Sequence, residues 1–447
     1  MRAEPAAVTA ATAATGPQPK GPRWLLPAGA LLLAAVLAVY LADLVTHLSY
    51  MAAMRDLVVY RDGGLIVRHV SPAYEPHHGQ GSSPLYDWTG QNGVQFTYPP
   101  FAAVIFAVGS VLSWTAMRWA MTLASLAALG LSLWLVFGAL GYRDRPAVRL
   151  GATLGVSALA LATEPVQQTL ALGQVNLLLM LLVVADLLTA GALTPGGLKG
   201  RTRWWHGLGI GIAAGVKLTP LIFIPYLLLI RRYRQAATAT AVFAATAALG
   251  YALLPHDSST YWAHGLFLKA NRIVFLGTRG NQSLRGVLTR LAGSVSSGTV
   301  PWIAAAILVA IAGLAAAALL YRARQPVPAM LACALTGLLV SPLSWDHHWV
   351  WVAPGIALLA HLGATAVRGL VRAAWWAAAA GLFLIFACWP QFWNLGQSGL
   401  TPAGLGWYAP GTYFATGSKP WYHEFHWHGL QLLAGNSAVL TGLASLA

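Results

Sequence analysis

The segment SPLSWDHHW (341–349) places an acid and two histidines side by side between two apolar runs. Ionisable side chains are costly at membrane depth and usually serve a function there. An imidazole transfers protons near neutral pH, and a neighbouring carboxylate can fix its tautomer. Adjacent histidines point apart on a regular helix, which disfavours a zinc site. We therefore predict that Asp346, His347 and His348 take part in proton transfer or anion binding.

The composition indicates a membrane protein. The 447 residues are 57% hydrophobic and 9% charged, whereas a soluble domain has about 25% charged residues. Nineteen tryptophans fit the aromatic belts found at bilayer interfaces. The net charge of +15 is typical of basic cytosolic loops, so we expect no nucleic-acid partner. Cys333 and Cys388 lie in apolar runs and indicate neither a disulfide nor a metal framework.

Hydropathy predicts an all-α polytopic protein with about twelve transmembrane helices. Residues 1–23 are expected to be a disordered cytosolic tail, and 24–447 a single transmembrane domain. The expected spans are 24–46, 116–140, 148–162, 172–192, 206–217, 219–230, 236–254, 301–321, 327–343, 349–363, 374–390 and 428–446.

Basic loops set the expected orientation. With a cytosolic N-terminus, RRYR (231–234), YRAR (321–324) and VRGLVR (367–372) fall inside. The outer segments are then 47–115, 255–300 and the aromatic 391–427. Residues 101–113 are apolar but short, and counting them as a crossing would place the basic loops outside. We therefore expect a re-entrant or interfacial helix there.

This topology brings polar residues to the outer side and predicts a polar pocket there. Each of these polar residues also has a simpler structural interpretation. Asp56 could be an ordinary loop acid, and Asp62 before Gly63–Gly64 is more typical of a turn. Lys217 could reach a lipid headgroup, and Glu164 before Pro165 could only mark the start of a helix.

Six motifs in order resemble glycosyltransferase family 87, integral-membrane enzymes of the GT-C superfamily. They are DLVVY (56–60), FTYPPF (96–101), LGQVNLLL (172–179), GVKLTPL (215–221), GNQSLRG (280–286) and SPLSWDHHW (341–349). Within the family, the chain most resembles the polyprenyl-phosphate-mannose-dependent α-1,2-mannosyltransferases of mycobacteria. The resemblance implies a GT-C fold in the plasma membrane with a periplasmic active site. It also implies a polyprenyl-phosphate mannose donor and a phosphatidylinositol mannoside, or related glycolipid, as acceptor.

The resemblance also implies roles for individual residues in an inverting transfer. Asp56 is the expected general base, with Asp62 in reserve and the His347–His348 pair assisting. Lys217, Arg279 and Arg285 are expected to bind the donor phosphate. The expected substrate contacts are Tyr60, Asp62, Tyr98, Glu164, Gln174, Asn176, Asn281, Gln282, Trp345 and Asp346. Side-chain cations can neutralise a lipid monophosphate, so no obligatory cofactor or metal is expected, although an Asp56–Glu164 metal pair stays open.

Other readings stay open as well. A lipid transporter would share the polar pocket, but it would show inverted repeats, which the sequence lacks, and would not need Asp56. Within the enzyme class, lipomannan-branching mannosyltransferases and polyprenyl-phosphate arabinofuranosyltransferases share the same motifs. The motifs do not separate these substrates.

Overall fold

The protein is helical throughout the part that the computed structural model describes, namely residues 22, 24–46, 54–70, 84–87, 95–189, 205–269, 276–278, 280–387, 433 and 435–446. Within these residues there is no strand, and only an isolated antiparallel bridge joins Asn281 to Trp345. The predicted all-α class is confirmed. The expected tail at 1–23, apart from residue 22, and the aromatic segment at 391–427 lie outside the described residues.

The elements follow one another along the chain as helices with short 3-10 or π segments. They are α1 (Leu25–Thr46), α3 (Arg55–Val67), α4 (Pro84–Asp87), α5 (Pro100–Gly109), α6 (Trp114–Phe137), η2 (Gly138–Tyr142), α7 (Pro146–Leu161), α8 (Glu164–Leu172), α9 (Asn176–Leu188), α10 (Leu208–Val216), η4 (Thr219–Ile222), α11 (Phe223–Leu229), α12 (Tyr233–Leu253), α13 (Pro255–Ser258), η5 (Ser259–Ala263), η6 (Leu266–Leu268), α14 (Leu284–Ala292), α15 (Val295–Arg322), α16 (Pro326–Val340), η8 (Asp346–Trp351), α17 (Val352–Thr365), α18 (Gly369–Ala387) and α20 (Ser437–Leu446).

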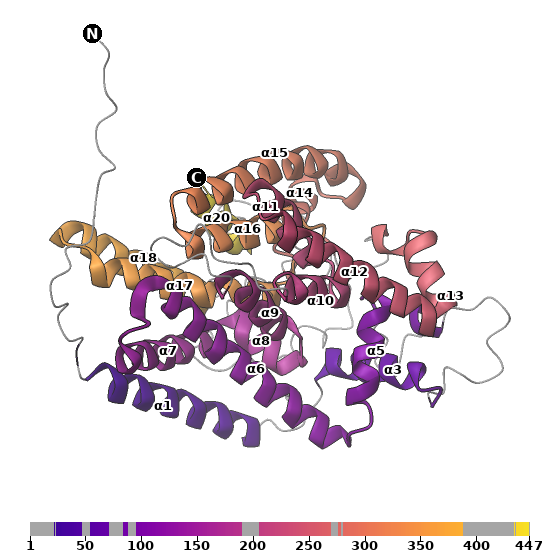
Figure 1. Ribbon diagram of the computed structural model, residues 1–447, viewed down its shortest axis with the longest axis horizontal. Coiled ribbons are helices and arrows are strands. Elements are labelled where there is room, and N and C mark those ends of the chain that lie inside the picture. The colour runs from indigo at the N-terminus through magenta and orange to yellow at the C-terminus, as the bar shows by residue number, and fades with distance from the viewer. Residues whose placement is uncertain are drawn as a thin grey trace, which may run out of the picture.

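Short central helices lie between longer outer ones. In Figure 1, α1 runs along one edge, with α6 and α7 beside it, and α15 runs along the opposite edge. Between them lie α8, α9 and α10. The segment η8 packs against α8 and α9, and α16 packs along α15. The helices of the centre therefore end inside the molecule, where their terminal residues can meet.

Four described helices are long and apolar enough to cross a membrane, by length and composition: Trp114–Tyr142, Tyr233–Leu253, Val295–Arg322 and Gly369–Ala387. The pair α7 and α8, bent by 75°, would make a fifth as a broken span. On α15, side chains such as Val300 and Leu308 are exposed, as expected for a helix facing lipid. Each of the twelve expected spans overlaps a described helix, but among the described residues only these four helices and the bent pair meet this test.

Two local details differ from the expected bounds. Residues 164–172, between two expected spans, form a helix of their own, α8, and Glu164 before Pro165 marks its start. The outer segment ending at residue 300 already contains the start of α15, which begins at Val295 and includes Pro301. Pro301 is the seventh residue of this helix and lies beyond its first turn, where a proline removes one backbone hydrogen bond.

Asp62 does not lie in a turn, which corrects the expectation drawn from the two following glycines. It lies inside α3. A Cβ added at Gly64 would come within 2.5 Å of the Phe106 carbonyl oxygen, and one at Gly63 within 2.8 Å of the Phe96 ring. The glycines therefore let α5 pack directly on the α3 backbone, and this close approach explains them better than a turn does.

The close approach gives a testable expectation for stability. Gly64→Ala should lower the thermal unfolding midpoint in detergent, because overpacking against a backbone carbonyl costs about 1–3 kcal/mol. In the matched control Gly130→Ala, within α6, the new methyl meets nothing within 4 Å. There the midpoint should rise slightly, since alanine favours a helix over glycine by about 0.5–1 kcal/mol. Equal midpoints for the two variants would contradict the α3–α5 packing.

Candidate active site

The Asp56 carboxylate is the acid at the centre of the site. It lies in the first turn of α3, where the helix dipole favours a negative charge, and it accepts a hydrogen bond from the Gln174 Nε2 amide. Burial raises the pKa of the Asp56 carboxyl, while His347, Gln174, Lys217 and Arg55 act in the opposite direction. A carboxylate held in this way is a stronger proton acceptor than an exposed one.

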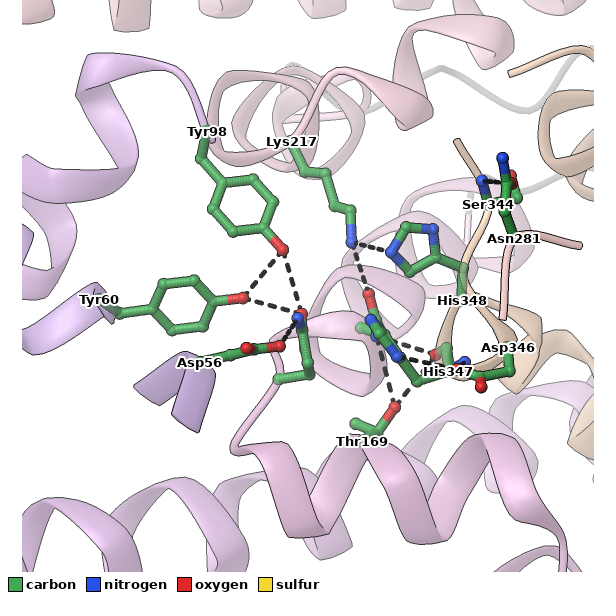
Figure 2. A network of polar contacts seen from close by, with 12 residues as sticks. Asp56, Tyr60, Tyr98, Thr169, Lys217, Asn281, Ser344, Asp346, His347 and His348 are labelled. Atoms are coloured by element: carbon green, nitrogen blue, oxygen red, sulfur yellow. Dashed lines mark hydrogen bonds and ion pairs between the residues drawn. The ribbon is translucent and has the colours of Figure 1, made fainter. Parts of the chain in front are cut away.

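Two tyrosines fix the orientation of the Gln174 amide. The Tyr60 hydroxyl, one turn beyond Asp56, lies 2.8 Å from Gln174 Oε1 and 2.9 Å from the Tyr98 hydroxyl. The Tyr98 hydroxyl lies 3.1 Å from the same Oε1. Because the amide oxygen accepts from hydroxyls, the amide nitrogen must point at Asp56 and act as a donor. Figure 2 shows Asp56, Tyr60 and Tyr98 gathered on one side of the network.

The turn between α8 and α9 brings Gln174 to this place. Gly173 ends α8 in the left-handed conformation with φ 68°, which glycine adopts readily. A Cβ at Gly173 would lie 2.6 Å from the Leu57 Cβ, so this turn approaches α3 closely. The LGQVN motif therefore ends α8 at Gly173 and packs closely against α3 there. It then supplies the polar side chains of Gln174 and Asn176.

Lys217 supplies a positive charge to the site. It follows the last residue of α10 in extended conformation, at a helix end whose dipole favours a cation. Its Nζ donates to Asn176 Oδ1 at 3.0 Å, lies 2.8 Å from His348 Nε2, and stands 5.3 Å from the centre of the Tyr98 ring. No carboxylate of the described residues forms an ion pair with this ammonium.

The contact with Lys217 decides the tautomer of His348. An ammonium group has only donors, so His348 Nε2 must accept and the proton of the neutral ring must lie on Nδ1. His348 is 8% exposed, and its Nδ1 is buried without a hydrogen-bond partner in the described part of the chain. The ring thus carries a spare donor in the site.

The His347 side chain faces the neighbouring Asp346, and hydrogen bonds to the His347 backbone fix its position. Its Nδ1 lies 3.0 Å from Asp346 Oδ1, and its backbone N–H donates to the same oxygen at 2.7 Å. Its carbonyl oxygen accepts from Asn176 Nδ2 at 2.8 Å and from the Thr169 hydroxyl at 3.1 Å. Asn176 therefore links the Lys217 ammonium to the His347 backbone.

The GNQS motif holds the histidine segment from its other side. The Asp346 N–H donates to the Gly280 carbonyl at 2.9 Å, and the Gln282 N–H to the Ser344 carbonyl at 2.7 Å. The Asn281 side chain accepts from the Ser344 N–H at 3.1 Å and donates to the Leu276 carbonyl at 2.9 Å. In Figure 2, Asn281 and Ser344 lie on the far side of the histidines from Asp56.

Sequence reasoning missed the residue that fixes this motif. Arg290, 2% exposed, donates to the carbonyls of Thr278 at 2.5 Å and Asn281 at 3.2 Å, and to the Asn436 side chain. The Gln282 Nε2 amide donates to the Gly435 carbonyl at 2.7 Å. The available signal in the sequence was an arginine shortly after GNQSLRG, in a segment with the pattern of an amphipathic helix. Thr169 was missed too.

The structure brings most of the expected residues together, with roles that stay predictions. Asp56, Tyr60, Tyr98, Gln174, Asn176, Lys217, His347, His348 and Asp346 form the contacts above, and Glu164 touches Asp346. The Asn281 side chain binds neighbouring chain atoms, which gives it a role in holding the loop. The ring of Trp345 stacks at 6.5 Å from that of His347.

Two expected residues, Arg285 and Asp62, are not among the residues joined by these contacts, and a third, Arg279, lies outside the described residues. The Arg285 guanidinium lies 4.8 Å over the Trp302 ring of α15. Asp62 lies six residues beyond Asp56 on α3, so it projects from a different face of the helix. Burial raises the pKa of Asp62, and Arg61 opposes that rise.

A small cavity of about 50 Å³ lies beside the cation. It is bordered by Lys217, His348 and Asn176 on one side and by apolar residues such as Met180 and Phe223 elsewhere. The cavity thus has one polar end and apolar walls elsewhere. In the described part of the chain, no group of three or more His, Cys, Asp or Glu residues is placed to hold a metal ion.

A buried carboxylate, an ammonium and two histidines thus meet inside a helical protein that has membrane-spanning candidates, and groups of this kind suit an enzyme that transfers a chemical group. Residues 96–342 match the model of glycosyltransferase family 87. The chain belongs to this family and is a glycosyltransferase.

Its relatives include two mycobacterial enzymes. A polyprenol-phosphate-mannose-dependent alpha-(1-2)-phosphatidylinositol mannoside mannosyltransferase of Mycobacterium tuberculosis is 34% identical over 69% of this chain and 70% of the relative. A polyprenol-phosphate-mannose-dependent alpha-(1-2)-phosphatidylinositol pentamannoside mannosyltransferase of Mycolicibacterium smegmatis is 33% identical over 81% of each chain. No solved structure matches the chain.

The Gln174 contact predicts a shift in the pH dependence of glycosyl transfer. Gln174→Leu removes a donor that favours the ionised Asp56, so the pKa of Asp56 should rise. A base must be ionised to act, and the acid limb of the kcat/KM profile should therefore move to higher pH. The exposed Gln325→Leu is the control and should leave the limb in place. An unchanged limb in an active Gln174→Leu variant would contradict the contact.

Proposed function

We propose that this enzyme moves mannose from polyprenyl-phosphate mannose to a hydroxyl of a phosphatidylinositol mannoside, forming an α-1,2 linkage with inversion. The donor and the acceptor class follow the names of the relatives. The observation that carries the chemistry is one buried carboxylate, Asp56, in the same polar network as Lys217, an ammonium that forms no ion pair with a carboxylate among the described residues. One group suits the acceptor proton, and the other suits the leaving phosphate.

Asp56 would act as the general base. The acceptor hydroxyl attacks the anomeric carbon of the donor, its proton passes to the Asp56 carboxylate, and the bond from that carbon to the phosphate oxygen breaks. Charge on Asp56 also favours a sugar carbon that gains positive character. The Gln174 amide and the two tyrosines hold the carboxylate, so it need not reorganise during transfer.

Lys217 would take the charge that develops on the polyprenyl phosphate. Its present partners, Asn176 Oδ1 and His348 Nε2, are neutral acceptors, so a phosphate oxygen would supply the missing negative charge. Such an interaction is strong in a site from which water is excluded. The His348 Nδ1–H offers a further donor. Because these groups suffice for a monophosphate, we propose that transfer requires no metal ion.

We further propose the location and orientation that the basic loops suggest. About twelve helices would cross or enter the plasma membrane, with RRYR (231–234) and YRAR (321–324) in the cytosol and the site at the periplasmic side. The Gly280–Ser283 segment and η8 would then face the periplasm, where both lipid substrates can reach them. Reactivity of single introduced cysteines toward an impermeant thiol reagent tests this orientation.

Asp56→Asn should lower mannose transfer by about 10²–10⁴-fold, the usual contribution of a general base. The amide keeps the size of the side chain but does not accept a proton. The measurement is transfer by purified protein, with polyprenyl-phosphate mannose as donor and phosphatidylinositol mannosides of different length as acceptors.

Asp62→Asn is the matched control, since it alters an acid on the same helix but on a different face. If Asp62→Asn is inactive and Asp56→Asn is active, the base is Asp62. If wild type transfers no mannose but does transfer arabinofuranose, or mannose only to a lipomannan precursor, the substrate proposal is wrong and the enzyme class stands.

Lys217→Met should lower kcat by about 10–10³-fold, because the leaving phosphate loses its cation in the transition state. The long apolar side chain keeps the packing of the cavity. The KM for the acceptor should change less than kcat, because in this proposal the ammonium acts on the donor phosphate. Transfer by wild type should also continue in excess EDTA; loss of activity there, restored by a divalent cation, would show that a metal shares this task.

A further inference from the structure

Two turns between helices contain an arginine in an unusual backbone conformation. Arg231, after α11, and Arg324, after α15, have φ angles of 60° and 61°. This is the left-handed region, which glycine adopts readily and which strains a residue with a Cβ. Both turns close in the same way, because the N–H of the residue after the arginine donates to a carbonyl five residues earlier. Each arginine therefore stands where a helix most often ends with glycine.

A tyrosine joins the two turns into one surface. Arg232 Nε donates to the Tyr321 hydroxyl at 2.9 Å, and the Arg232 guanidinium carbon lies 5.6 Å from the centre of the Tyr321 ring. The helices α11 and α15 also pack against each other (Figure 1). RRYR (231–234) and YRAR (321–324) thus form a single basic surface, which we call the paired-turn surface. Its exposed arginines are Arg231, Arg234, Arg322 and Arg324.

No acid within these two segments offsets the charge. Residues 219–240 and 308–332 contain neither Asp nor Glu. Asp186 approaches α12 through Gln235, but it is 2% exposed, and its carboxylate already accepts from the Gln235 amide and from the backbone N–H groups of Gly207 and Ile210. The paired-turn surface therefore presents concentrated positive charge, which attracts anions.

Two general rules explain only part of this charge. Basic residues are common in cytosolic loops, and they are favourable near helix C-termini. Neither rule requires an arginine at the left-handed residue itself, because glycine there would leave the neighbouring arginines in place. Strained backbone is typical of residues whose side chain serves a function. Arg231 and Arg324 are therefore the residues to which a ligand would be assigned first.

Exposed apolar side chains lie directly beside both turns. Leu228 and Leu229 precede the first turn and Tyr233 follows it, while Leu319, 61% exposed, precedes the second. The protein surface thus changes from apolar to basic within about one helical turn. Such a change matches the boundary between the acyl chains and the headgroups of a bilayer, where tyrosines also gather. An acidic soluble protein would match the charge but would not account for the leucines.

We propose that the paired-turn surface binds the headgroup phosphate of anionic phospholipids through Arg231 and Arg324. A guanidinium pairs with two phosphate oxygens at once, which an ammonium does not do. This site is separated from Lys217 along the chain by η4 and α11, and it does not depend on the proposed reaction. In the orientation proposed above, the bound lipid belongs to the cytosolic leaflet.

Replacing both arginines by glycine tests the site. Arg231→Gly with Arg324→Gly relieves the left-handed turns, so the unfolding midpoint in neutral detergent without added lipid should be no lower than that of wild type. Added phosphatidylglycerol should raise the midpoint of wild type. The concentration that gives half of this rise should be about 25-fold higher for the double variant, since each basic side chain near an anionic surface contributes about fivefold to binding.

Two further variants separate the charge from the backbone. Arg231→Gln with Arg324→Gln keeps a Cβ at both left-handed residues and removes only the charge, so its response to phosphatidylglycerol should weaken as much as that of the glycine variant. His69→Gly is the matched control, because His69 ends α3 in the same left-handed conformation, with φ 55°. It should keep the wild-type response.

The proposal is overturned if either double variant responds to phosphatidylglycerol at the same concentrations as wild type, or if phosphatidylcholine gives the same arginine-dependent rise. It is also overturned if soluble polyglutamate, at equal ionic strength, raises the midpoint as much through the same two arginines, which would indicate an acidic protein partner. Because turnover is not measured, failure here leaves the proposed mannose transfer untouched, and failure of that transfer leaves this site untouched.

Discussion

The structure depends on holding several charges close together in an interior that water scarcely reaches. An isolated charge in such a place costs several kcal/mol, so each must face an opposite charge or a well-aimed dipole. Asp56 has the Gln174 amide and a helix N-terminus, and Asp346 has the His347 N–H groups. Among the described residues, the hydrogen-bond partners of Lys217 are neutral acceptors. In the function proposed above, this imbalance is what an anionic substrate would correct.

Short helices that end inside the molecule make this arrangement possible. A spanning helix presents side chains, but a helix end also presents backbone groups and a dipole. Here α8 ends beside Leu57, α10 ends just before Lys217, and η8 begins at Asp346. Longer outer helices such as α15 carry the exposed apolar surface. The outer helices are therefore suited to contact lipid, while the short central helices hold the polar residues of the site.

Much of the fold and site could be predicted from the sequence because both rest on local signals. Apolar runs marked the helices, and the motifs around Asp56, Gln174, Lys217 and His347 pointed to residues that do meet. The rest depends on packing between distant segments. Nothing local distinguishes a glycine in a turn from one that lets a neighbouring helix pack closely, which is why Asp62, before two glycines, was expected in a turn. Arg290 was missed because it binds carbonyls that only the folded chain brings together.

The clamp at Arg290 links the site to a late part of the chain. Asn281 and Gln282, which brace the histidine segment, are themselves fixed through Arg290 and Gly435–Asn436. During synthesis the chain emerges in order, so the GNQS motif lacks these anchors until about 150 further residues have been inserted. The enzyme should therefore become competent only after Gly435 and Asn436 have been synthesised, and a ribosome stalled before residue 435 would leave a membrane-inserted but unassembled site.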